Sequence, residues 1–146
     1  MRLWHYKLLP YLPDLQFKGQ LRELVAIMHD WRDKGKTNHL LINRVMEYPK
    51  SELTEYFLEY EYLYKERYGK MLDKRYEEFK AFASSEHYEA GHIIYAGWHN
   101  KEYLRVCMAN LYEKHHFGIG KNRITDEERK TLCKGYKAIT GEEYVI

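Results

Sequence analysis

Apolar residues recur at helical spacing along most of the chain, and glycine, proline and capping residues separate the segments where they do so. The first segment begins at Asp14 and continues to about Lys34, and Gly35 ends it. Its expected buried stripe consists of Leu15, Leu21, Leu24, Val25, Met28 and Trp31. Further amphipathic helices are predicted at about 51–68, 70–84, 100–116 and from 126 onward.

Residues at the ends of these segments agree with the helical assignment. Ser51 can cap one helix, and Gly69 ends it. A capping box that begins at Thr125 starts the last helix. A short, mainly apolar segment at 39–46 favours a short helix, and residues 85–99 have the composition of a loop.

The N-terminus has a different pattern from the rest of the chain. Residues 1–12 are apolar and aromatic, but Pro10 and Pro13 oppose a regular helix. We expect these residues to form an extended arm that packs on the body of the protein. The pattern therefore predicts an all-α fold, a compact single-domain helical bundle of residues 1–146 with an extended N-terminal arm.

Length and composition place the chain among packed soluble proteins. At 146 residues, with 45% hydrophobic and 32% charged residues, it can bury a sizeable core in one domain. No apolar run approaches the roughly 18 residues of a membrane span, and prolines and charges interrupt any signal-peptide core. We therefore expect a cytoplasmic monomer without a membrane partner, whose Cys107 and Cys133 are reduced thiols.

Charge is unevenly distributed along the chain, although the net charge is only +2. Residues 1–44 hold eight Lys or Arg against four Asp or Glu, whereas residues 45–90 hold seven against eleven. Residues 91–146 are mildly basic again, with nine against seven. The two basic ends could form one face for a polyanion, and ordinary surface charge is the alternative. The fifteen tyrosines and three tryptophans fit core packing, and some of them could stack on exposed bases.

Candidate chemistry lies near the start of the chain. Met1 carries the terminal α-amine, which is less basic than a lysine and therefore partly neutral near pH 7. The positive charges of Arg2 and Arg22 favour that neutral form. Glu23 follows Arg22 on the first predicted helix, at the edge of its apolar face. A neutral amine can attack the anomeric carbon of a sugar, and a nearby carboxylate can stabilise the cation that forms.

Together these residues resemble the pyrimidine-dimer DNA glycosylases of the phage endonuclease V type. In that family the nucleophile is the α-amine of the mature first residue, and an Arg follows it. About twenty residues later, an Arg-Glu-Leu triplet on the first long helix provides the essential Glu. Met1-Arg2 and Arg22-Glu23-Leu24 match these features, with the spacing longer by one residue.

The resemblance is clear over residues 1–35 and diffuse beyond them. It implies a glycosylase with abasic-site lyase activity on UV-induced pyrimidine dimers, with damaged double-stranded DNA as partner and no metal or other cofactor. The large side chain of Arg2 would retain the initiator residue, so the resemblance assigns catalysis to Met1 itself and to Glu23. Basic residues on or beside the first helix are placed to meet phosphates, together with Arg2 and Arg22: Lys18, Arg32, Lys34 and Lys36.

Two other functions remain open from the residues alone. The basic ends and the aromatic residues would also suit a helical nucleic-acid-binding module without catalysis. His87, His92 and His99 could instead hold the metal of a hydrolase, although their spacing matches no standard zinc site. The aromatic residues after Arg2, which are Trp4, His5 and Tyr6, could pack the arm or contact a flipped base.

Overall fold

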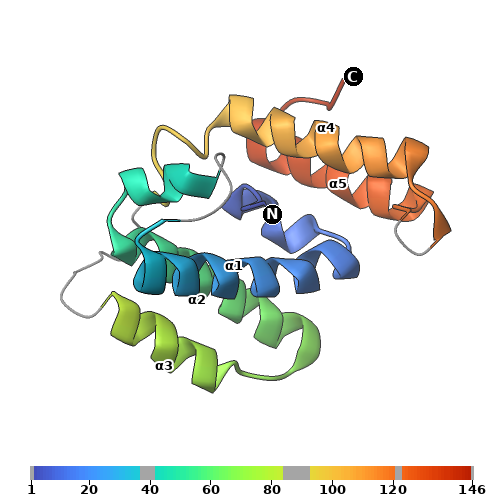
Figure 1. Ribbon diagram of the computed structural model, residues 1–146. Coiled ribbons are helices and arrows are strands. Elements are labelled where there is room, and N and C mark those ends of the chain that lie inside the picture. The colour runs from blue at the N-terminus through green and yellow to red at the C-terminus, as the bar shows by residue number, and fades with distance from the viewer. Residues whose placement is uncertain (1, 37–41, 84–92, 121–122, 146) are drawn as a thin grey trace. The chain divides into compact units, whose positions relative to one another are not determined.

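A computed structural model describes residues 2–36, 42–83, 93–120 and 123–145 of the chain (Figure 1). Within these ranges the structure is all-α, with no strand, which confirms the predicted fold class. The helices are η1 (Tyr6–Tyr11), α1 (Asp14–Lys34), η2 (Ile42–Glu47), α2 (Lys50–Tyr68), α3 (Asp73–Phe82), α4 (Lys101–Phe117) and α5 (Asp126–Thr140). The labels η1 and η2 denote 3-10 helices.

The chain divides into two compact units. Unit 1 consists of Met1–Leu3 and Gln20–Tyr95, and unit 2 consists of Trp4–Gly19 and Ala96–Ile146. Each unit is therefore made from two separate stretches of sequence. The expectation that residues 1–146 form one domain stays a prediction.

In unit 1, α2 and α3 pack against each other in antiparallel directions. The Thr54 hydroxyl near the start of α2 donates to the carbonyl of Phe79 near the end of α3, at 3.1 Å. Further along α2, a Glu61 carboxylate oxygen accepts from the backbone N–H of Leu72, just before α3 begins. Phe57 and Phe79 stack between the two helices with their ring centroids 4.4 Å apart. These contacts bury the apolar faces that the helical spacing predicted.

The unit 1 part of α1 completes this core. Leu24, Ile27 and Met28 are fully buried on one side of the helix. At its C-terminal end, Trp31 meets Phe82 of α3 edge-on, with ring centroids 5.3 Å apart. The first helix thus holds the candidate residues Arg22 and Glu23 on a packed scaffold.

In unit 2, α4 and α5 form an antiparallel pair that lies side by side in Figure 1. His115 near the end of α4 contacts Asp126 at the start of α5, with Nε2 and Oδ1 2.7 Å apart. The 3-10 helix η1 packs on α5 at Gly135, where a Cβ would lie only 2.4 Å from the ring of Tyr11. Only glycine therefore allows this close approach of the two elements.

Helix ends were predicted with mixed success. The capping box is confirmed, because the Thr125 hydroxyl accepts from the N–H of Glu128 while the Glu128 carboxylate accepts from the N–H of Thr125. The assignment of Ser51 as a cap is wrong. The helix already begins at Lys50, and Ser51 is buried in its first turn. At the other end of α2, Gly69 has a left-handed backbone and ends the helix as predicted.

Two further details of the N-terminal region differ from expectation. The arm is not extended throughout, because residues 6–11 form the 3-10 helix η1 despite Pro10. Proline has the φ of a helix and lacks only the N–H donor, so a short 3-10 helix tolerates it. Leu15 is 46% exposed and does not belong to the buried stripe, whereas Phe17, two residues further on, is fully buried.

None of the helices among the described residues is long and apolar enough to cross a membrane.

Candidate catalytic site on the first helix

The N-terminal backbone is bound to α1 through the side chain of Glu23. The backbone N–H of Arg2 donates to Glu23 Oε2 at 2.9 Å, and both residues belong to unit 1. The carboxylate is half-buried, so one of its oxygens is committed to this bond in a partly desolvated place. The sequence analysis paired Glu23 with the amine of Met1, and the structure places the Glu23 carboxylate on the backbone of the next residue, Arg2.

Gln20 completes this attachment and was missed by the sequence reasoning. Its side-chain amide nitrogen donates to the carbonyl of Arg2 at 2.8 Å and lies 3.4 Å from Glu23 Oε2. Its amide oxygen accepts from the hydroxyl of Tyr56 on α2 at 3.1 Å. Both backbone polar groups of Arg2 are therefore held by side chains of α1. The available signal was a polar residue three positions before Glu23, on the same face of the helix.

The environment of Glu23 makes its carboxyl a weaker acid than an exposed one. Burial raises the pKa of this carboxyl above its ordinary value. The hydrogen bond from the Arg2 N–H and the charges of Arg2 and Arg22 act in the opposite direction, but burial is the larger effect. A carboxyl in this state can exchange a proton near neutral pH more readily than an exposed one.

The structure describes all of the predicted site residues except Met1. Met1 lies outside the described residues, so the site is defined from Arg2 onward. Arg2 is half-buried, whereas the side chain of Arg22 is exposed on α1. Lys18 is also exposed, and it lies on the part of α1 that belongs to unit 2.

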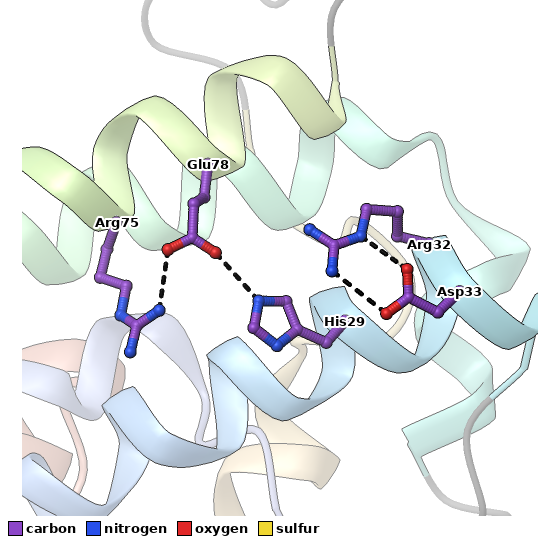
Figure 2. Close-up of polar contacts among 5 residues, drawn as sticks. All are labelled: His29, Arg32, Asp33, Arg75 and Glu78. Atoms are coloured by element: carbon purple, nitrogen blue, oxygen red, sulfur yellow. Dashed lines mark hydrogen bonds and ion pairs between the residues drawn. The ribbon is translucent and has the colours of Figure 1, made fainter.

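Basic residues at the end of α1 are exposed but partly neutralised. Arg32 makes a two-bond contact with Asp33, at 2.8 and 3.1 Å (Figure 2). Lys34 lies 3.6 Å from Asp30, one turn earlier on the same helix. Lys36 follows the helix and is exposed. A phosphate that approached Arg32 or Lys34 would therefore have to compete with a carboxylate on the same helix.

A second polar group links α1 to α3 in unit 1 (Figure 2). The Nε2 atom of His29 lies 2.9 Å from one oxygen of Glu78, and Arg75 donates to the other oxygen at 2.8 Å. These contacts hold the pKa of Glu78 below its ordinary value, with the hydrogen bond to His29 as the largest cause. The group ties two helices together and engages both oxygens of the Glu78 carboxylate.

Aromatic residues of the arm pack within unit 2. His5 is buried, and its ring stacks on the ring of His99 with centroids 5.1 Å apart. Tyr6 stacks on His5, and Tyr103 of α4 stacks on His99. Burial lowers the pKa of His5 to about 4, so it is neutral at physiological pH. The packing interpretation of His5 and Tyr6 is therefore supported within this unit.

The metal hypothesis concerns a segment that is only partly described. His87 and His92 lie outside the described residues, and His99 belongs to the aromatic stack. Among the residues that the structure describes, no group of three or more His, Cys, Asp or Glu side chains could hold a metal ion. Cys107 is buried in α4 and Cys133 is half-buried in α5, and both are free thiols.

Comparison with known proteins identifies the family. The sequence model of one family, described as pyrimidine dimer DNA glycosylase, matches residues 1–76. The match covers the N-terminal backbone, α1 and α2, and thus all residues of the Arg2, Gln20, Glu23 and Tyr56 arrangement. No curated protein and no solved structure gives a significant match to the chain. The matched region is more than half of the sequence, and the chain belongs to the pyrimidine dimer DNA glycosylase family.

Proposed function

We propose that this protein removes UV-induced pyrimidine dimers from double-stranded DNA and then cleaves the strand as an abasic-site lyase. The α-amine of Met1 is the nucleophile, and the Glu23 carboxylate acts beside it. The observation that carries the proposal is the 2.9 Å hydrogen bond from the Arg2 N–H to Glu23 Oε2. Membership of the glycosylase family supports the base-release step, and the lyase step extends it.

Covalent geometry supports the pairing of the amine with Glu23. Three bonds of about 1.3–1.5 Å each separate the α-amine of residue 1 from the backbone nitrogen of Arg2. That nitrogen is 2.9 Å from Glu23 Oε2, so the carboxylate holds the chain three bonds away from its α-amine. We therefore expect both groups to reach the same reacting centre.

In the first step, the neutral amine donates its lone pair to C1′ of the damaged nucleotide. The glycosidic bond breaks, and its electron pair leaves with the base, which takes up a proton. Glu23 faces the positive charge that develops on the sugar and stabilises it as a carboxylate. It then accepts a proton from the attached amine and passes it to the ring oxygen, which opens the sugar and leaves an iminium group.

In the second step, the iminium group acidifies the proton on the neighbouring C2′ carbon. Loss of that proton forms a double bond, and the C3′–O bond breaks with its electron pair on the departing phosphate. Water finally hydrolyses the iminium group and returns the free amine. Glu23 is suited to these transfers because burial raises its pKa toward the working range.

The polar contacts around residue 2 hold the backbone that leads to the amine. Gln20 and Glu23 hold the backbone of Arg2 from both sides, and Tyr56 orients Gln20 from α2. Arg2 and Arg22 add positive charge near the amine and the flanking phosphates, so they favour the neutral amine and bind the strand. We assign the remaining phosphate contacts to Lys18, Arg32, Lys34 and Lys36.

Borohydride trapping tests the nucleophile directly. Reduction of the iminium group links protein and DNA covalently, which neither a binding module nor a metal hydrolase would do. The protein with a free Met1 should crosslink to duplex DNA that contains an abasic site. The same protein with an uncleaved N-terminal extension should not, because the extension replaces the primary amine by an amide.

The control for this test is the tagged protein after clean removal of the tag, at equal concentration. Peptide mapping of the crosslinked product should locate the sugar remnant on residue 1. Equal crosslinking by the tagged protein would show that a lysine, and not Met1, is the nucleophile. Loss of activity in a metal chelator would favour the hydrolase instead.

A further inference from the structure

The short segment after α5 in unit 2 contacts basic side chains of both α4 and α5. Gly141 ends α5 with a left-handed backbone, at φ 77°. Glu142 Oε2 then lies 2.6 Å from Nζ of Lys101 at the start of α4, and Glu143 Oε1 lies 2.7 Å from Nζ of Lys137 on α5. Two consecutive glutamates after α5 thus form ion pairs with lysines, one on α4 and one on α5.

An open cavity of about 250 Å³ lies at this end of unit 2. Lys7 and Lys101 line it together with the polar residues Asn100 and Thr140, and none of the described lining residues carries a carboxylate. Leu104 contributes an apolar wall. The cavity also adjoins the N-terminal end of α4, where the helix dipole adds positive potential. The chemistry of this lining suits an anion.

Glu142 reaches this lining through its contact with Lys101. Its contact with Lys101 holds the pKa of the Glu142 carboxyl below its ordinary value. Both side chains remain about half exposed, at 51% for Lys101 and 59% for Glu142. Exposed pairs of this kind are weak and are screened by salt, so a polyanion can replace the carboxylate.

We propose that the cavity between Lys7 and Lys101 binds a phosphate group of a nucleic-acid strand. In the free protein Glu142 is paired with Lys101, and the strand displaces the Glu142 carboxylate when it binds. The inference rests on the proposed function, because it takes DNA as the partner. It adds a phosphate contact in unit 2 to those that we assign to α1 and its surroundings. Such a contact supplies affinity and register but reads no base sequence.

The first test compares two single-charge variants. Glu142→Gln removes the competing carboxylate and should tighten binding to an undamaged duplex by about threefold to tenfold at low salt. Glu127→Gln is the matched control. Glu127 is an exposed partner of Lys130 at the other end of α5, 3.2 Å away, and its removal changes the net charge equally. Fluorescence anisotropy over a series of salt concentrations measures both affinities, and thermal unfolding verifies that both variants are folded.

The lysines provide the second test. Lys7→Ala and Lys101→Ala should each weaken duplex binding and reduce the slope of log affinity against log salt by about 0.9. The Glu142→Gln gain should disappear in the Lys101→Ala background, because the freed lysine is then absent. Glu142→Gln that behaves like Glu127→Gln, or a gain that survives without Lys101, would overturn the proposal. Tighter binding of inorganic phosphate alone, without tighter binding of duplex, would overturn the assignment to nucleic acid.

The binding measurements and the trapping experiment can refute their hypotheses separately. Binding to undamaged duplex involves no chemistry, whereas borohydride trapping reports the nucleophile. Trapping with no Glu142→Gln effect would refute the phosphate cavity and leave the glycosylase mechanism intact. A Glu142→Gln gain without trapping would support the cavity and refute the imine mechanism.

Discussion

At the scale of single residues, Glu23 makes a structural contact and has a shifted pKa that suits the chemical task we propose for it. Its carboxylate accepts the Arg2 N–H, and burial keeps its pKa high. The first property fixes the chain beside residue 1, and the second suits proton transfer. A neutral amide at this position could keep the first property and lose the second, which separates the two tasks by experiment.

We predict that Glu23→Gln folds normally and binds duplex DNA but loses base release by about 10²- to 10⁴-fold. The Gln oxygen can still accept from Arg2, but it can neither stabilise a cation as an anion nor transfer a proton. Single-turnover cleavage of dimer-containing DNA measures the loss, and anisotropy measures binding. Normal cleavage by the variant would contradict the catalytic assignment.

The same variant has a predicted pH signature in stability. Because burial raises the pKa of Glu23, the folded protein holds the proton more tightly than the unfolded chain. This contribution to stability is fully present below the unfolded pKa and is lost as pH rises through the folded pKa. Glu23→Gln should therefore gain stability relative to the native protein as pH rises, and the gain should vanish below about pH 4. Denaturant unfolding at several pH values tests this sign.

Residue-scale prediction from sequence was possible where a local pattern carried the information. Arg22 and Glu23 are neighbours on a helix, and their relation to the N-terminus came from a family resemblance. Gln20 and Tyr56 could not be assigned in this way. Their hydrogen bond joins positions 36 apart, and only the packing of α1 against α2 reveals that Gln20 holds Arg2.

At the scale of elements, close packing is sensitive to single atoms at the contact between η1 and α5. A Cβ at Gly135 would lie 2.4 to 2.9 Å from three atoms of Tyr11, including its Cβ and Cγ. Those atoms are near the backbone of η1, so a change of side-chain rotamer cannot relieve the overlap. The whole 3-10 helix would have to move.

We predict that Gly135→Ala destabilises the protein by about 1–3 kcal/mol, the usual cost of overpacking. In an exposed helix, alanine would instead be favoured over glycine by about 1 kcal/mol, so the sign of the change is informative. Lys134→Ala is the control, because this neighbouring side chain is exposed on the same helix. Urea unfolding of both variants measures the difference, and a stabilised Gly135→Ala would show that η1 does not pack here.

Element boundaries were predictable where side-chain chemistry fixes them. Thr125 and Glu128 satisfy each other's backbone donors, and this reciprocal pattern is visible in the sequence. Ser51 had equal capping chemistry, but the backbone had already turned into a helix one residue earlier. The 3-10 helix around Pro10 was unexpected because proline opposes a long regular helix but still permits a short 3-10 helix.

At the scale of the whole molecule, the fold class followed from periodicity but the division into units did not. Each unit combines stretches that lie far apart in sequence, with Met1–Leu3 in unit 1 and the adjoining Trp4–Gly19 in unit 2. Helical spacing shows which face of a helix is buried, but it does not show which partner covers that face. The charge distribution is a second molecular property, since the first 44 residues hold twice as many basic as acidic side chains.

Arg32 is one of the basic residues that we propose to contact DNA phosphates. Arg32 is neutralised by Asp33, and this contact lowers the pKa of the Asp33 carboxyl. Arg32→Ala should weaken duplex binding similarly for all sequences and reduce the salt slope by about 0.9, because a phosphate contact is lost. Asp33→Asn should tighten binding and steepen the slope, because Arg32 then meets phosphate without competition.

Asp73→Asn, at the exposed start of α3, makes the same change in net charge away from Arg32. Equal tightening by Asp33→Asn and Asp73→Asn would mean that net charge alone governs affinity, and Arg32 would then have no specific place in the interface.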